Sequence, residues 1–122
     1  NGKLTVAGFC WGGGNAFRFA THRPGLEAAF VFYGSFGMTA EDVARIECPV
    51  YGFYGGNDAR VTATVPETRV LMEKAGKKYE PVVYEGAGHG FMRTGEAPDA
   101  SEANRKARAA AWERWKALLK KL

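Results

Sequence analysis

Four short apolar segments alternate along the chain with four segments of helical periodicity. The apolar segments cover residues 4–9, 27–33, 49–54 and 79–84, and their continuous hydrophobicity is typical of strands buried on both faces. The helical segments cover residues 12–21, 39–45, 65–75 and 101–122. This alternation predicts an α/β fold of three layers, in which a mostly parallel sheet of about four strands has helices on both faces.

Local signals mark helix ends and buried faces. Thr39 with Asp42 has the offset of a capping box, although Glu or Gln is the usual partner, and Gly76 is a typical C-terminal stop. Helical spacing predicts that two sets of side chains point inward: Val65, Val70, Leu71 and Met72, and Ala111, Trp115, Leu118 and Leu122. We expect the tryptophans of the last helix to be core residues rather than a ligand platform.

The chain reads as a single domain over residues 1–122. It shows no internal repeat or linker, and a chain of this length buries roughly two thirds of the surface that it exposes when unfolded. It opens at Asn1 without a methionine and runs almost at once into a strand. This start suggests a fragment or a cut chain.

Charge and cysteine content narrow the function classes. Much of the net charge of +4 comes from the last twenty residues, which we interpret as a solvated helix face rather than a nucleic-acid site. No run of about 18 apolar residues predicts a membrane span. Cys10 and Cys48 match neither a disulfide framework nor a zinc-ligand spacing. We therefore expect no metal site and a reduced, cytoplasmic setting.

The strongest chemical signal lies between the first strand and the first helix, in the sequence Gly8-Phe9-Cys10-Trp11-Gly12. This G-x-C-x-G pattern is a nucleophile elbow with cysteine in the serine position. The turn puts Cys10 at a helix N-terminus, where the partial positive charge favours the thiolate. A buried, inert cysteine is the structural alternative. A phosphate-binding loop fits less well, because the Walker lysine and the G-x-G-x-x-G spacing are missing.

Two further strands end in residues that complete a hydrolytic site. Asp58 follows the third strand and His89 the fourth, each after glycines. The carboxyl ends of parallel strands meet at one rim of a sheet, and the order nucleophile, acid, histidine is that of an α/β-hydrolase. Taken singly, Asp58 reads as a loop cap, and His22 is expected on the surface. The placement of all three residues at one rim of the sheet predicts a Cys10–His89–Asp58 triad. The Trp11 backbone N–H is then expected to be an oxyanion donor.

These motifs resemble those of the dienelactone hydrolase (carboxymethylenebutenolidase) family. That family's elbow reads G-x-C-x-G-G, its triad is Cys, Asp and His, and its histidine segment A-G-H-x-F-x-R-T-G is similar to residues 87–95. The resemblance covers the whole chain but only about the second half of the family's domain, which implies a half-size α/β-hydrolase fold. It also implies that Arg93 holds a substrate carboxylate through its guanidinium. A surface salt bridge is the alternative role.

The resemblance implies an enzyme that cleaves small carboxylic esters or lactones through a thioester acyl-enzyme and needs no cofactor. Two other functions stay open: a non-catalytic half-domain that binds a partner, and a promiscuous esterase or acyltransferase. The second oxyanion donor normally comes from a loop after an earlier strand, and it cannot be assigned here. The first strand lies in mid-sheet in the full fold, so its edge is bare in this chain. We therefore predict a homo-oligomer in which a neighbouring subunit covers that edge.

Overall fold

The computed structural model describes residues 2–35 and 37–122, and these form one four-stranded sheet. The strands, hydrogen-bonded in chain order, are β1 (Thr5–Phe9), β2 (Ala28–Phe32), β3 (Val50–Gly55) and β4 (Tyr79–Tyr84). Every neighbouring pair is parallel. The predicted α/β architecture is confirmed. Asn1, on which the expectation of a fragment rests, and Phe36 lie outside the described residues.

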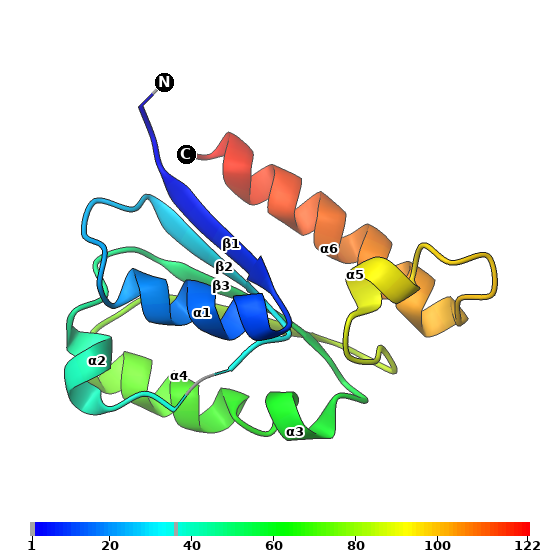
Figure 1. The fold of residues 1–122 in the computed structure, drawn as a ribbon, viewed down its shortest axis with the longest axis horizontal. Coiled ribbons are helices and arrows are strands. Elements are labelled where there is room, and N and C mark those ends of the chain that lie inside the picture. The colour runs from blue at the N-terminus through cyan, green and yellow to red at the C-terminus, as the bar shows by residue number, and fades with distance from the viewer. Residues whose placement is uncertain (1, 36) are drawn as a thin grey trace.

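Helices cover both faces of this sheet (Figure 1). On one face lie α1 (Trp11–Ala20), α2 (Ala40–Ala44) and α4 (Val65–Lys74). On the other lie α6 (Glu102–Lys120), orange to red in the figure, and α5 (Phe91–Thr94). A short helix, α3 (Ala59–Thr62), follows β3. The sequence pattern does not predict α3 and α5, because four residues make about one turn and show no periodicity.

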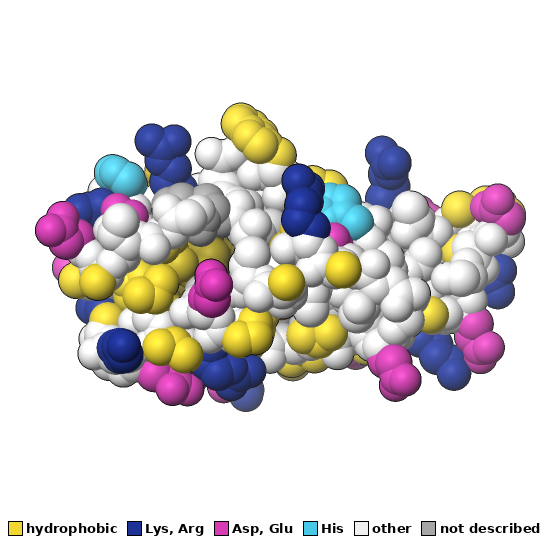
Figure 2. Space-filling view, turned by 90° about the horizontal axis from the view of Figure 1, so that it is seen from below, with side chains coloured by type: hydrophobic (Ala, Val, Ile, Leu, Met, Phe, Trp, Pro, Cys, Tyr) yellow, Lys and Arg dark blue, Asp and Glu magenta, His cyan; other side chains and the backbone are white. Residues whose placement is uncertain are grey.

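Charged side chains of both signs are interspersed on the face over α3 and α4, which Figure 2 shows. Many basic residues of α6 are engaged within the chain. Arg105, Arg108 and Arg114 donate to backbone carbonyls, and Lys106 and Lys116 pair with acidic residues of the same helix. Among the described residues, no helix is both long enough and apolar enough to cross a membrane.

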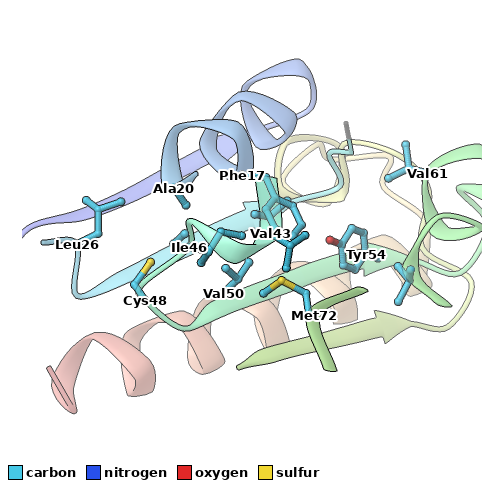
Figure 3. Packing of buried hydrophobic residues seen from close by; sticks show 13 residues of the cluster. Phe17, Ala20, Leu26, Val43, Ile46, Cys48, Val50, Tyr54, Val61 and Met72 are labelled. Atoms are coloured by element: carbon cyan, nitrogen blue, oxygen red, sulfur yellow. The ribbon is translucent and has the colours of Figure 1, made fainter. Parts of the chain in front are cut away.

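The face under α1, α2 and α4 is filled by a largely aliphatic cluster, shown in Figure 3. Alternate residues of a strand point to the same face, so Ala29 and Val31 of β2 both belong to this cluster. The helices pack over these strand residues and contribute Phe17, Val43 and Met72, which are nearly or fully buried. Three helices thus exclude water from this side of the sheet.

The opposite face is aromatic. Phe30 and Phe32 of β2 and Phe53 of β3 point toward α6, and all three are 0% exposed. Register places Phe9, Phe32 and Phe53 side by side on adjacent strands, where their rings stack with centroids 4.4 and 4.2 Å apart. This row of stacked rings lies at the carboxyl ends of the strands, directly below the predicted site.

Most predicted core positions are confirmed, and two differ. Val70 is 49% exposed, because five helical residues after the buried Val65 correspond to about 140° of rotation. Trp115 packs in the aromatic core as expected, but Trp112 stacks on it at 5.2 Å and stays 37% exposed. Trp112 is therefore a partly exposed surface residue rather than a core residue.

Helix caps agree with the sequence. The Thr39 hydroxyl accepts from Asp42 N–H at 3.2 Å, and the Asp42 carboxylate accepts from Thr39 N–H at 2.9 Å, so the capping box of α2 is confirmed despite its aspartate. Ser101, the predicted first residue of the last helix, is the N-cap of α6. Its side chain accepts from Asn104 N–H.

Candidate active site

Cys10 occupies the turn between β1 and α1 in a conformation that few residues adopt. Its φ of 56° and ψ of −123° lie outside the regions that side-chain-bearing residues prefer, and strain of this kind costs about 1–3 kcal/mol. Backbone bonds hold the turn: Cys10 N–H donates to the Phe32 carbonyl at 3.1 Å, and the Cys10 carbonyl accepts from Gly13 N–H at 2.9 Å. The elbow predicted from G-x-C-x-G is thus present as a strained strand-to-helix turn.

Two glycines leave the space that this turn needs. A Cβ on Gly8 would lie 1.9 Å from the Gly12 oxygen, and one on Gly34 would lie 2.3 Å from the Gly14 nitrogen. Both neighbouring atoms belong to the backbone, so no side chain can rotate away. The missing side chain at Gly8 lets the start of α1 pack closely on β1. The missing side chain at Gly34 lets α1 pack closely on the segment after β2.

The loops that follow β3 and β4 are bonded to each other. Asn57 N–H donates to the Ala87 carbonyl at 2.9 Å, and a Cβ on Gly55 would lie 2.4 Å from that same oxygen. Gly88 N–H donates to the Asn104 side chain of α6 at 3.0 Å. These contacts fix the two loops relative to each other just before Asp58 and His89.

Asp58 and His89 meet in a short hydrogen bond. His89 Nδ1 lies 2.6 Å from Asp58 Oδ2, and the side chains are 42% and 9% exposed respectively. An ionised carboxylate only accepts hydrogen bonds, so Nδ1 carries the proton and Nε2 is left as an acceptor. Asp58 is also the N-cap residue of α3, yet its side chain makes no capping bond. Its carboxylate therefore serves the imidazole rather than the loop.

Cys10 and His89 together line two cavities. The large cavity, of about 460 Å³, has apolar walls from Phe9, Met92 and Trp112 and also contains Arg93. The small cavity, of about 310 Å³, is more polar and contains Arg60, Ser35 and Thr64. Cys10 and His89 thus border the same two spaces at the rim of the sheet.

Trp11 is the first residue of α1 and follows the sulfur directly. Its backbone N–H is one of the four that the start of a helix leaves without an intrahelical acceptor. The residue is 85% exposed and lines the small cavity. The geometry that an oxyanion donor needs, an unused backbone N–H beside the nucleophile, is therefore available at Trp11.

Tyr33 packs against the imidazole from the side. Its ring meets that of His89 edge to face, with centroids 5.2 Å apart, and its backbone is strained at φ 39°. Burial raises the pKa of Tyr33 to about 12, and negative charge on nearby Cys10 adds to the rise, against a backbone hydrogen bond from Met92 and the charge of Arg93. The Tyr33 phenol is therefore neutral near pH 7, a hydrogen-bonding group and not a base.

Comparison with known proteins agrees with this geometry. The model of the dienelactone hydrolase family matches residues 1–122, the full length of the sequence. The chain belongs to the dienelactone hydrolase family. Against the "Putative carboxymethylenebutenolidase" of Saccharolobus solfataricus it is 35% identical over 120 residues, which cover 98% of this chain and 45% of the relative.

Solved structures of dienelactone hydrolases give the same picture. A "Putative Dienelactone Hydrolase" from Klebsiella pneumoniae is 30% identical with a TM-score of 0.79, over 93% of this chain and 50% of that one. A dienelactone hydrolase-like promiscuous phosphotriesterase from metagenomic libraries has a TM-score of 0.84 at 24% identity, over 98% of this chain and 52% of that one, and so supports the fold. The chain spans about half the length of these relatives.

The sequence of this member of the dienelactone hydrolase family does not by itself predict several of the residues that line the cavities. They are Phe9, Tyr33, Arg60, Met92 and Trp112. Tyr33 follows β2 directly, so the rule that selected Asp58 and His89, a position just after a strand, also selects it. Met92 and Trp112 come from α5 and α6, and no motif in the sequence marks them.

Proposed function

We propose that this chain hydrolyses carboxylic esters or lactones with Cys10 as nucleophile, His89 as acid and base, and Asp58 as the group that orients the imidazole. The observation that carries the proposal is the 2.6 Å bond between His89 Nδ1 and Asp58, with Cys10 and His89 lining the same two cavities. Membership of the dienelactone hydrolase family supports the same reaction class. The strained turn at Cys10 supports a functional role for the sulfur.

In the first step His89 Nε2 takes the proton of the Cys10 thiol, and the resulting thiolate attacks the carbonyl carbon of the ester. The carbonyl oxygen becomes an oxyanion, which the Trp11 N–H stabilises at the N-terminus of α1. When the tetrahedral intermediate collapses, the bond to the leaving oxygen breaks and His89 gives that oxygen its proton. The products of this step are an alcohol and a thioester on Cys10.

In the second step water hydrolyses the thioester. His89 Nε2 accepts a proton from the water, and the resulting hydroxide attacks the acyl carbon. The sulfur leaves as a thiolate, and the carboxylic acid is released. Asp58 holds the imidazole in one tautomer throughout and stabilises its protonated form.

Substrate binding is assigned to the large cavity. Arg93 lies there with Phe9 and Met92, so a small substrate with an apolar body and one carboxylate matches the lining chemically. A guanidinium binds a carboxylate through two parallel hydrogen bonds. We therefore propose Arg93 as the residue that binds a substrate carboxylate.

Replacement of the nucleophile tests the reaction. Cys10→Ala should lower kcat for an activated ester by about 10⁴-fold or more, because loss of a nucleophile removes the covalent pathway. Cys48→Ala is the matched control, since Cys48 is buried in the aliphatic cluster. Intact-mass measurement with a panel of esters should show an acyl adduct on Cys10. Wild-type turnover by Cys10→Ala would contradict the proposal.

Thiol alkylation separates an enzyme from a non-catalytic half-domain. In the proposed enzyme Cys10 reacts near neutral pH much faster than Cys48, because burial raises the pKa of the Cys48 thiol. Equal and slow alkylation of both thiols favours the partner-binding function. Comparison of a dienelactone with neutral short-chain esters shows whether the substrate range is narrow or promiscuous.

A further inference from the structure

We propose that Arg60 forms a second anion-binding position, in the small cavity, so that preferred substrates carry acidic groups on both sides of the reacting carbonyl. The inference rests on the proposed function, because it places the carbonyl at Cys10. It adds a specificity residue that neither the elbow nor the histidine motif contains. Arg60 follows Asp58 by two residues, on α3, and lines the same cavity as Cys10 and His89.

The charge of Arg60 has no partner within the described part of the chain. No hydrogen bond or ion pair joins its guanidinium to another described residue. Arg108 in the large cavity differs, because it donates to the Met92 carbonyl at 2.8 Å and lies 3.7 Å from Glu96. A cation that faces a cavity without an internal partner is available to bind an anion.

The lining of the small cavity fits a small anionic or strongly accepting group. Arg60 is joined there by Ser35 and Thr64, and the described lining contains no carboxylate. Glu67 lines the next cavity, of about 150 Å³, together with the same Ser35 and Thr64. Its negative charge limits how far an anion can extend past Arg60. A single carboxylate suits this space better than a long acidic chain.

Arg60 and Arg93 each belong to one of the two cavities that share Cys10, Tyr33 and His89. A substrate whose carbonyl carbon meets the sulfur can therefore extend one way toward Arg93 and the other way toward Arg60. The chemical class is a small ester or lactone with two acidic groups, one on each side of the reacting carbonyl.

A pair of alkylating probes measures the anion preference without ester turnover. Iodoacetate and iodoacetamide both alkylate the Cys10 thiolate with loss of iodide, and they differ in one negative charge. A change in sulfur reactivity affects both probes alike, so the ratio of their rate constants reports anion binding. Arg60→Gln should lower the iodoacetate to iodoacetamide ratio by about threefold to tenfold, the range for a partly exposed charge-assisted contact.

Arg23→Gln is the matched control, because Arg23 is exposed and, among the described residues, its guanidinium donates only to the neighbouring Pro24 carbonyl. This variant loses the same charge and should keep the wild-type ratio. Arg60→Lys keeps the charge but not the planar fork, and should give a ratio between wild type and Arg60→Gln. A wild-type ratio in Arg60→Gln overturns the inference, as does an equal fall in Arg23→Gln.

Ester kinetics then test the substrate class. With a matched series of esters, Arg60→Gln should lower kcat/KM for the diacidic member by about tenfold and leave the neutral member within about twofold. Equal losses for all members would overturn the specificity role. Failure of the proposed function is distinct: Cys10 would then react with neither probe faster than Cys48, and no ester would be cleaved by any form of the chain.

Discussion

The two faces of the sheet are built from the same strands but differ in how they are closed. Three helices close the aliphatic face, where Phe17, Val43 and Met72 are at most 2% exposed. One long helix, α6, covers most of the aromatic face and leaves Phe9 and Trp112 each more than a third exposed. The large cavity of the site is lined by these two partly exposed residues. The comparison teaches that both layers bury large side chains, while the partly closed layer also leaves room for the large cavity.

A stacked ring lies directly beside the nucleophile on the partly closed side. Phe9 stacks on Phe32, and Phe9 immediately precedes Cys10. The sulfur is therefore attached to a strand end that ring stacking holds in place.

The largest expected effect comes from deleting one buried ring on each face. Phe17→Ala and Phe32→Ala should each lower the free energy of unfolding by about 3–5 kcal/mol, because both rings are at most 2% exposed. The two variants should differ in activity. Per folded molecule, kcat for an activated ester should fall at least tenfold in Phe32→Ala and little in Phe17→Ala.

Urea unfolding and active-site titration of Cys10 measure these two quantities. If either variant fails to fold, Phe17→Leu and Phe32→Leu make the same comparison with a smaller cavity. Equal loss of kcat in both variants, after correction for the folded fraction, would show that the aromatic row does not position the elbow.

A smaller effect is expected from the arginine that joins α6 to the sheet. Arg114 donates to the carbonyls of Gly52 and Glu80, each at 2.6 Å, and its guanidinium lies 4.4 Å from the Phe53 ring centroid. Arg114→Met should lower the free energy of unfolding by about 1.5–3 kcal/mol, the range for hydrogen bonds to charged groups. Arg105→Met, which loses one bond to Pro98, should cost less than about 1 kcal/mol. Equal losses in thermal unfolding would refute the role of Arg114.

On the aliphatic face the capping box of α2 gives a pH-dependent effect. Thr39→Ala should cost about 1 kcal/mol near pH 7. The backbone N–H of Thr39, with help from its hydroxyl and Arg45, lowers the pKa of the Asp42 carboxyl. A lowered folded-state pKa gives stability that is present above the ordinary carboxyl pKa and is lost as the pH falls through the folded value. The stability difference between wild type and Asp42→Asn should therefore shrink as the pH drops below about 4. A difference that is constant from pH 7 to pH 2 would contradict this account.

The smallest effect on stability concerns the open edge. Within the described residues β1 pairs only with β2, and Leu4 and Leu119 are both more than 40% exposed. We propose, as the sequence predicts, that a second copy of the chain covers this edge. Leu119→Lys should leave the free energy of unfolding within about 0.5 kcal/mol but weaken self-association. Val70→Lys, at a position of similar exposure on the other face (49% against 43%), is the control in light scattering. A strictly monomeric wild type at micromolar concentration would contradict the proposal.

The sequence predicts the sheet well because burial on two faces makes the strands continuous in hydrophobicity. Each of the four predicted strands agrees with the structure within about two residues at either end. The short helices α3 and α5 escape prediction, since their turns are fixed by tertiary bonds such as that from Thr62 to the Gly55 carbonyl. The exposure of Val70 shows that a run of apolar residues does not by itself decide which side of a helix is buried.

For the site, motif residues could be predicted and cavity walls could not. Cys10, Asp58 and His89 stand at strand ends, where topology alone places them on one rim. Tyr33 meets the same rule but belongs to no recognised motif. Trp112 reaches the large cavity from a helix that begins some 90 residues after β1, a distance over which helical periodicity carries no information on neighbours.

The backbone contact at Gly8 has a practical consequence for laboratory evolution of this chain. Saturation of Gly8 or Gly34 would yield libraries of misfolded variants, because any side chain there overlaps main-chain atoms. Trp11 and Arg60 face the small cavity from exposed positions and can be randomised without disturbing the core. New substrate scope is therefore best selected one residue beyond the sulfur and two beyond the acid.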